Sequence, residues 1–183
     1  MALPSAAPVV LLSGGGKGLG RLSRDAQALL AASPRAHLLV LCGANENLHG
    51  ALSAHREAGA RLRVFGPQPA ELVATMMAAG DLHLGKPGGL SAAESLASGL
   101  PMVLSRPLPG QEEDNARRLV ELGAAAACSP DQAVEMAARL LENRAALRGL
   151  RLAAASVGRP DAAARAAFEI AALARNWALV PVI

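Results

Sequence analysis

Short apolar runs, each followed by a turn that contains glycine or proline, recur along most of the chain. The predicted strand segments, here called runs, lie at residues 9–12, 36–42, 61–65, 81–85, 102–105 and 124–128. Those at 9–12 and 36–42 are the most continuously apolar, whereas those at 61–65 and 81–85 also contain charged or polar residues. Stretches with apolar residues at helical spacing separate them, and one of the expected helices covers residues 47–58. Continuous apolar runs indicate strands covered on both faces, and strands joined through helices indicate parallel pairing. The sequence therefore predicts an α/β fold with a parallel sheet of about six strands and helices on both faces.

The length and the spacing of the runs indicate one domain with short flanking segments. The chain has 183 residues, close to the usual size of a single domain. We expect a linker at residues 1–8, one ligand-binding domain at residues 9–176 and an apolar tail at residues 177–183. Beyond residue 130 the spacing predicts helices alone.

Composition and charge exclude several classes of function. The formal net charge of +3 is scattered along the chain, so it indicates no nucleic-acid tail. The aromatic residues are Phe65, Phe168 and Trp177, too few for a base-stacking platform. No apolar run reaches the length of a membrane span, and the distant Cys42 and Cys128 predict reduced thiols. These features predict a cytoplasmic protein that binds no nucleic acid.

The first glycine-rich turn directly follows the first apolar run. Residues 13–20 read Ser-Gly-Gly-Gly-Lys-Gly-Leu-Gly, and glycine lets a phosphate approach backbone N–H groups at a helix start. The turn fits neither the Walker pattern nor G-x-G-x-x-G. A tight strand-to-helix turn also uses glycine, so a purely structural role stays open. The residues that we predict to lie near a phosphate are Gly14, Gly15, Gly16, Lys17 and Gly18.

A second turn of this kind follows the fourth apolar run and adds a lysine. The residues that we predict to hold a diphosphate here are Lys86, Gly88, Gly89, Leu90 and Ser91. Glu94 lies one turn into the helix expected from residue 91, where its carboxylate suits the two hydroxyls of a ribose. The alternative is a capping box, in which Glu94 accepts a hydrogen bond from the Ser91 N–H.

Acidic and amide side chains open the next helix, after Pro-Leu-Pro-Gly at residues 107–110. We predict that Gln111 and Glu112 face the same crevice and bind sugar hydroxyls, although the helix dipole alone also favours acids in a first turn. Phe65 ends the third run beside the same rim, either near a base edge or as a core residue. Because the carboxyl ends of parallel strands meet at one edge of a sheet, these groups together predict a glycosyl-donor site.

No side chains in the sequence form a convincing nucleophile and base, or a metal cluster. His37 and His83 fall in apolar runs and are predicted to lie in the core. We therefore expect neither a metal nor a bound cofactor. An epimerase would need an acid and a base, and the sequence offers no convincing pair.

The chain resembles the monogalactosyldiacylglycerol synthases and the processive diacylglycerol glucosyltransferases in a two-part motif. The motif reads KPGGLSAAESLASGLP at residues 86–101 and PLPGQEEDN at residues 107–115. The wider likeness is to glycosyltransferase family 28, which includes the peptidoglycan N-acetylglucosaminyltransferase. The resemblance covers about residues 9–128. It implies the carboxyl-terminal, donor-binding half of a GT-B fold, a Rossmann-like domain.

The resemblance also assigns roles to these residues. It implies a UDP-sugar as co-substrate, with both glycine turns at the diphosphate and Phe65 near uracil. Glu94 would bind the ribose, and Gln111 with Glu112 would bind the donor sugar. The implied reaction is an inverting, metal-independent transfer of a hexose to a lipid-type acceptor. In the family, the acceptor site and the general base come from an amino-terminal half, which this sequence does not contain.

Three alternatives follow from the lack of this amino-terminal half. We expect a domain of a longer lipid glycosyltransferase, a donor subunit that pairs with a separate acceptor protein, or a nucleotide-sugar-binding module without transfer. In the first two cases an acceptor domain is the partner, and peripheral contact with the cytoplasmic face of a membrane would occur through that partner. The sequence does not distinguish glucose, galactose and N-acetylglucosamine as the sugar.

Overall fold

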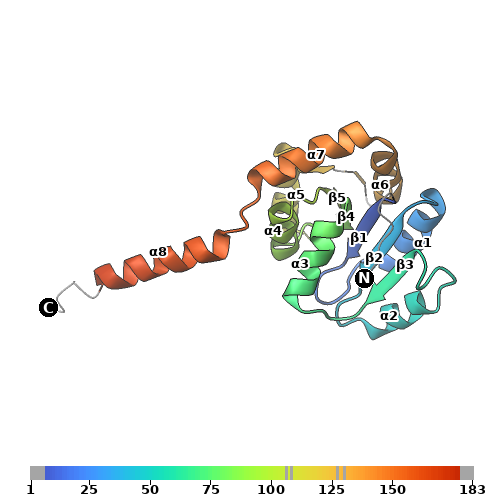
Figure 1. The fold of residues 1–183 in the computed structure, drawn as a ribbon, viewed down its shortest axis with the longest axis horizontal. Helices are drawn as coiled ribbons and strands as arrows, with labels where there is room; N and C mark the ends of the chain where they lie inside the picture. Colours follow the sequence, from blue (N-terminus) through green and yellow to red (C-terminus); the bar gives the residue numbers. More distant parts are fainter. Residues whose placement is uncertain (1–6, 106, 108, 127, 130, 178–183) are drawn as a thin grey trace.

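The computed structural model describes residues 7–105, 107, 109–126, 128–129 and 131–177, which form a twisted sheet with helices around it (Figure 1). The strands are β1 Val9–Ser13, β2 His37–Leu41, β3 Leu62–Phe65, β4 Leu82–Gly85, β5 Met102–Leu104 and β6 Ala125–Ala126. The helices are α1 Leu22–Ala32, α2 Glu46–Ser53, α3 Ala70–Ala79, α4 Gly89–Ala97, α5 Gln111–Glu121, α6 Ala133–Glu142, α7 Arg144–Val157 and α8 Ala162–Trp177.

The six strands form one parallel sheet in the order β3-β2-β1-β4-β5-β6. The chain builds outward from β1 to β3 and then crosses back, so that β4 pairs with the other edge of β1. Val10 of β1 accordingly lies opposite Leu38 of β2 and Leu82 of β4. This predicted α/β fold is confirmed, and its strand order reverses between β1 and β4. Sheets of this kind bind ligands at the carboxyl ends of the strands, at such a reversal.

The core lies on both faces of the sheet. Val10, Leu11 and Leu12 are consecutive residues of β1, and all three are fully buried. Val10 and Leu12 belong to the core cluster formed with α1 and α6, whereas Leu11 packs with Met76 of α3 on the other face. Consecutive side chains of a strand point to opposite faces of the sheet. When both faces are buried, the strand must be apolar throughout, which explains the continuous apolar runs.

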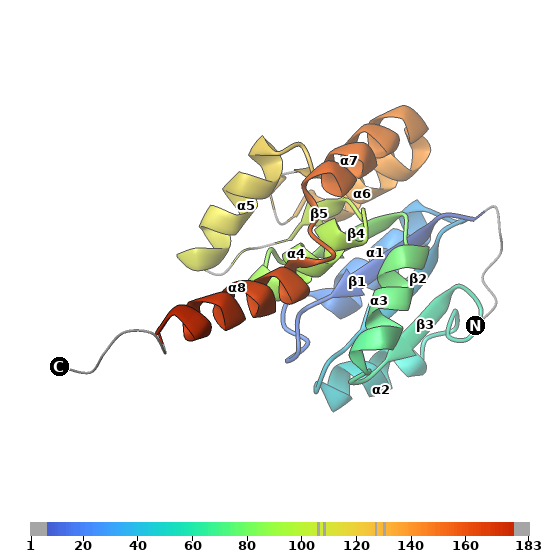
Figure 2. The same cartoon turned by 60° about the vertical axis from the view of Figure 1, so that its left-hand side comes forward.

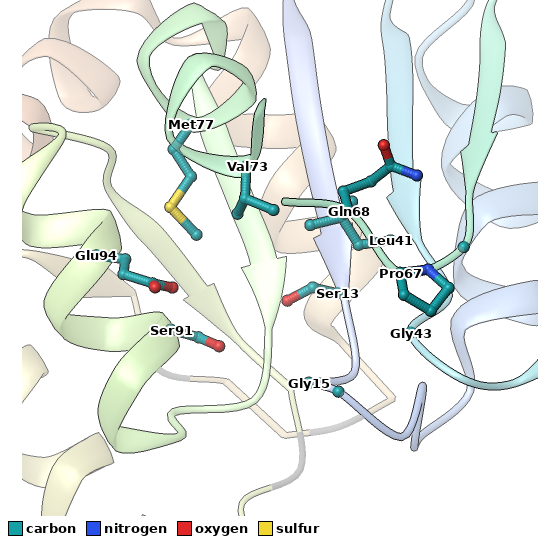
Figure 3. Close-up of a pocket in the computed structure, with 12 residues that line it drawn as sticks. Ser13, Gly15, Leu41, Gly43, Pro67, Gln68, Val73, Met77, Ser91 and Glu94 are labelled. Carbon is teal, nitrogen blue, oxygen red and sulfur yellow. The ribbon is translucent and has the colours of Figure 1, made fainter. Parts of the chain in front are cut away.

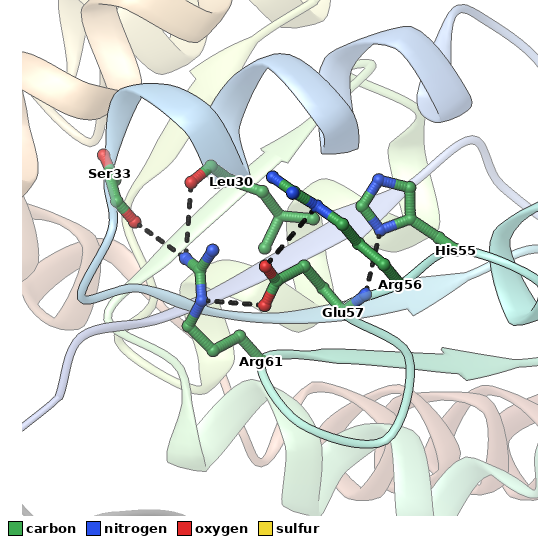
Figure 4. A network of polar contacts seen from close by, with 6 residues as sticks. All are labelled: Leu30, Ser33, His55, Arg56, Glu57 and Arg61. Carbon is green, nitrogen blue, oxygen red and sulfur yellow. Dashed lines mark hydrogen bonds and ion pairs between the residues drawn. The ribbon is translucent and has the colours of Figure 1, made fainter.

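A polar network joins the segment before β3 to the end of α1 (Figure 4). Arg61 donates to Glu57 Oε2 at 3.1 Å and to the carbonyl oxygens of Leu30 and Ser33 at 3.3 and 3.4 Å. The Glu57 N–H donates to His55 Nδ1 at 3.2 Å. The hydrogen bond from Arg61 lowers the pKa of the Glu57 carboxyl. The arginine thus satisfies carbonyl groups that the end of α1 leaves without helical partners.

Two local predictions differ from the structure. The helix expected over residues 47–58 is shorter, because α2 ends at Ser53 and the chain then turns through Gly59, whose φ is +81°, to reach β3. Cys42 directly follows β2 and Cys128 lies two residues beyond the end of β6, so neither cysteine is within a strand; both are free thiols. Burial raises the pKa of Cys42 to about 11.

The last helix extends away from the sheet and its covering helices (Figures 1 and 2). In α8 the side chains of Phe168, Ile170 and Leu173 are 66, 66 and 69% exposed. Among the helices of the described residues, none has both the length and the apolar character needed to cross a membrane. The tail expected at residues 177–183 lies outside the described residues except for Trp177, at which α8 ends.

Candidate functional site

A cavity of about 260 Å³ opens at the carboxyl ends of β1, β2 and β3, beside α3 and α4 (Figure 3). Its lining residues are Ser13, Gly15, Gly16, Leu41, Gly43, Gly66, Pro67, Gln68, Val73, Met77, Ser91 and Glu94. The side chains of Ser13, Ser91 and Glu94 border the same space in Figure 3. The cavity therefore occupies the place where the order of the strands reverses.

The first glycine turn divides into structural and cavity-lining residues. Gly14 and Gly18 are buried, and a Cβ on either would overlap a main-chain carbonyl oxygen. Gly15 and Gly16 line the cavity, while Lys17 is exposed and is not among its lining residues. The structural alternative thus accounts for Gly14 and Gly18, and the cavity places Gly15 and Gly16 where a ligand would lie.

The same turn leaves backbone donors free. Gly18 N–H donates to the Gly15 carbonyl and Leu19 N–H to the Gly14 carbonyl, at 2.9 and 3.0 Å. Within the described ranges, the amides of Gly15, Gly16 and Lys17 donate to no other backbone group. Successive unpaired N–H groups in a turn attract an anion.

Helix α4 begins two residues earlier than the sequence predicts. Gly88 is its N-cap, without a side-chain cap, so Ser91 is the third helical residue. The capping box between Ser91 and Glu94 is therefore absent from this helix. The N–H groups of the first helical turn have no helical acceptor and form the positive end of the helix dipole.

Glu94 is exposed at the cavity wall, and within the described residues its carboxylate forms no hydrogen bond or ion pair. A carboxylate in this state accepts hydrogen bonds without first giving up a protein partner. Its position one turn along α4 from Ser91 places it on the same side of the cavity as the start of the helix (Figure 3).

Lys86 joins the two halves of the motif. Its Nζ lies 2.6 Å from Glu112 Oε1, and the two side chains are only 20 and 12% exposed. Asn115 Nδ2 donates to the Pro87 carbonyl at 2.9 Å, which is a second link between the same segments. The Lys86 side chain also passes 3.3 Å from the place of a Cβ on Gly15. The structure thus brings both glycine turns and the start of α5 together at one edge of the sheet.

The acidic residues at the start of α5 have separate partners. Glu113 accepts from the Gly110 N–H at 3.2 Å and so caps its own helix. Asp114 forms an exposed ion pair with Arg117 on the next turn. Only Glu112 points toward the glycine turns, through Lys86. The prediction for Gln111 concerns a side chain that lies outside the described part of the structure.

The remaining predicted residues lie around the cavity but do not line it. Phe65 ends β3 and packs against the core cluster of Val9 and Leu11, and the wall beside it is formed by residues 66–68. Gly88, Gly89 and Leu90 form the start of α4 outside the lining, and Leu90 is 80% exposed. The proposed ligand contacts of all these residues stay predictions.

The sequence analysis missed the apolar wall and the floor of the cavity. Leu41, Val73 and Met77 are the apolar side chains that form this wall. Val73 and Met77 are four residues apart in α3, a spacing that puts them on one helix face. The floor holds Ser13, whose hydroxyl lies 2.8 Å from Nε2 of the buried His83. The prediction that His83 lies in the core is confirmed, and burial lowers its pKa to about 4.

No group of three or more His, Cys, Asp and Glu residues within the described ranges is placed to hold a metal ion. The cavity instead offers backbone amides, a lysine beside them, one unpaired carboxylate and an apolar wall. Amides and lysine suit phosphate oxygens, a carboxylate suits a diol, and an apolar wall suits a ring. This arrangement matches the parts of a nucleotide.

The sheet order and the position of the cavity define a Rossmann-like domain of the kind found in GT-B glycosyltransferases. The solved structure of Acinetobacter baumannii MurG has the same fold, with a TM-score of 0.62 and 22% identity over 91% of this chain and 53% of that chain. No protein-family model matches the chain.

The homologues of the chain are glycolipid glycosyltransferases, which confirms the resemblance predicted from the motif. Monogalactosyldiacylglycerol synthase 3 of Arabidopsis thaliana is 35% identical over 125 residues, 64% of this chain and 26% of the relative. The processive diacylglycerol beta-glucosyltransferase of Bacillus cytotoxicus is 30% identical over 158 residues, 85% of this chain and 40% of the relative. The chain thus spans less than half the length of these curated relatives.

Proposed function

We propose that the chain is the donor domain of an inverting glycosyltransferase and binds a UDP-sugar in this cavity. The unpaired carboxylate of Glu94 at the cavity wall carries the proposal, because it faces the same space as the free amides of the glycine turn. In this reading the diphosphate lies between Gly15, Gly16 and the start of α4. The ribose lies at Glu94 and the base lies against the apolar wall.

The donor sugar would lie toward the start of α5. Lys86 and Glu112 form an ion pair there, and both are close to the glycine turns. The lysine would bind the diphosphate and Glu112 a sugar hydroxyl, so the pair would exchange partners when the donor binds. The leaving UDP would then be stabilised by the α4 dipole and the backbone amides, a form of electrostatic catalysis that needs no metal.

The transfer itself would use a lipid-type acceptor held by a second domain. Support comes from the relatives, whose names describe transfer to diacylglycerol and which are more than twice as long as the matched region. The exposed apolar side chains of α8 supply a surface that such a domain would cover. We propose that the acceptor domain belongs to the same parent chain or to a separate protein, and that any membrane contact is peripheral and made by that domain.

The decisive experiment is calorimetric titration of the chain with UDP and with 2′-deoxy-UDP, in EDTA. Glu94→Ala should weaken UDP binding by about 5- to 150-fold, the equivalent of about 1–3 kcal/mol for a hydrogen-bonded group left unpaired. The same substitution should change 2′-deoxy-UDP binding much less, since one of the two hydroxyls is missing. Glu169→Ala, at an exposed glutamate of α8, is the matched control and should leave binding unchanged.

Two results would contradict the proposal. If neither UDP nor UDP-glucose, UDP-galactose or UDP-N-acetylglucosamine binds at millimolar concentration, the chain is not a competent donor domain. If Glu94→Ala weakens UDP and 2′-deoxy-UDP equally, Glu94 does not hold the ribose diol. The ranking of the three UDP-sugars would identify the sugar.

A further inference from the structure

A fully buried histidine lies between two serines beneath the floor of the cavity. His83 is in β4, Ser13 ends β1 and Ser95 lies in α4. His83 Nε2 is 2.8 Å from Ser13 Oγ, and His83 Nδ1 is 2.8 Å from Ser95 Oγ. His83 and Ser95 are fully buried, whereas Ser13 is 7% exposed and lines the cavity. The three side chains thus connect the interior to the place where the ligand would lie.

Burial determines which atoms carry the hydrogens. Within the described residues, His83 Nδ1 is the only hydrogen-bond partner of the Ser95 hydroxyl. The Ser95 O–H must therefore donate to Nδ1, because the opposite arrangement would leave a buried donor without an acceptor. A neutral imidazole with an accepting Nδ1 carries its hydrogen on Nε2. His83 Nε2–H then donates to Ser13 Oγ.

Among the described residues, His83 Nε2 is the only hydrogen-bond partner of the Ser13 hydroxyl. Because Nε2 carries the hydrogen of the ring, it cannot accept the hydrogen of Ser13. Ser13 Oγ already accepts from His83, so its own O–H is left to donate into the cavity beside Gly15 and Gly16. A donor at this place suits a phosphate oxygen. It does not suit the ribose hydroxyls, which need an acceptor such as Glu94 to receive their hydrogens.

The backbone of β4 leaves room for this arrangement. Gly85 follows His83 by two residues, so both project to the same side of the sheet. A Cβ on Gly85 would lie 2.6 Å from His83 Nε2, which would force the ring away from Ser13. Gly85 also pairs with Ser13 across the two strands. The glycine at the end of β4 therefore permits the contact between the ring and the cavity floor.

We propose that His83 is a positioning residue that orients the Ser13 hydroxyl as a hydrogen-bond donor to a diphosphate oxygen of the bound nucleotide-sugar. The chain of bonds Ser95–His83–Ser13, here called the relay, also holds α4, which carries Ser91 and Glu94, against β1. The proposal rests on nucleotide-sugar binding as the function of the site. Neutrality of the buried ring agrees with it, because a protonated ring would need two acceptors and would reverse the bond to Ser95.

The relay is tested first without ligand, by ¹⁵N NMR of the His83 ring in the full chain. We expect the Nε2–H tautomer in the wild type and a shift toward the Nδ1–H tautomer in Ser95→Ala. A wild-type Nδ1–H tautomer would overturn the proposal whether or not UDP binds. This measurement therefore separates failure of the relay from failure of the proposed function.

Titration with UDP and 2′-deoxy-UDP tests the effect on the ligand. Ser13→Ala should weaken both nucleotides by about 10-fold, the loss of one hydrogen bond to a charged group. Ser95→Ala should weaken both about 3-fold, and the double variant should bind no more weakly than Ser13→Ala alone. Ser13→Thr, which keeps the hydroxyl, should restore most of the affinity. Two results would overturn the proposal. One is a loss of affinity in the double variant equal to the product of the two single losses, and the other is a Ser13→Ala variant that weakens UDP but not 2′-deoxy-UDP.

Discussion

Acid should destabilise this fold through His83, by an amount that the structure allows us to calculate. The ring is fully buried, and burial lowers its pKa from 6.5 to about 4. The unfolded chain therefore binds a proton more tightly than the folded chain. Above pH 6.5 both states hold a neutral ring and the group has no effect. As the pH falls below 6.5, protonation stabilises the unfolded state alone, until the folded ring also titrates near pH 4.

The size of the effect follows from the shift in pKa. Each pKa unit corresponds to about 1.4 kcal/mol, so the whole shift is equivalent to a loss of about 3 kcal/mol by pH 4. At pH 5 the loss should be about 2 kcal/mol. For a domain with a free energy of unfolding of about 5–15 kcal/mol, this change is large enough to measure.

The assay is urea unfolding of the wild type and of His83→Gln between pH 8 and pH 4.5. Glutamine cannot titrate but keeps a hydrogen-bond donor and an acceptor, so the difference between the two proteins isolates the histidine. We expect the wild type to lose about 2 kcal/mol more than the variant between pH 8 and pH 5. Parallel stability curves for the two proteins would refute the argument, because they would show that the His83 ring has the same pKa in the folded and the unfolded chain.

Two further predictions concern the glycine turn and the ion pair. Gly18→Ala should lower stability by about 2–4 kcal/mol, because φ is +57° and a Cβ there overlaps a carbonyl oxygen. Gly50→Ala, in the open interior of α2, should instead raise the melting temperature slightly; equal effects would refute the stated cause. Glu112→Gln should release Lys86 and tighten UDP binding about 3- to 10-fold, while Asp114→Asn should change nothing. Weaker binding by Glu112→Gln would contradict the exchange of partners.

The sequence predicted those parts of the site that depend on short stretches of chain. Lys86 and Glu94 belong to one motif, and the structure places both at the expected end of the sheet. The start of α4 at Gly89 was predicted two residues late, because a glycine N-cap has no side chain to identify it. Within the first turn, the sequence did not show that Gly15 lines the cavity while Gly14 is packed. That distinction depends on neighbours from other segments.

By itself, the sequence determined the parallel sheet, since strands buried on both faces require continuous apolar residues that can be read locally. It also determined that polar turns gather at the carboxyl ends of the strands. Only the tertiary structure decided which distant polar groups meet. Ser13 and His83 are 70 positions apart and Lys86 and Glu112 are 26 apart. No local pattern encodes such pairs, because they arise from the crossing of the chain that sets β4 beside β1 and from the packing of helices on the sheet.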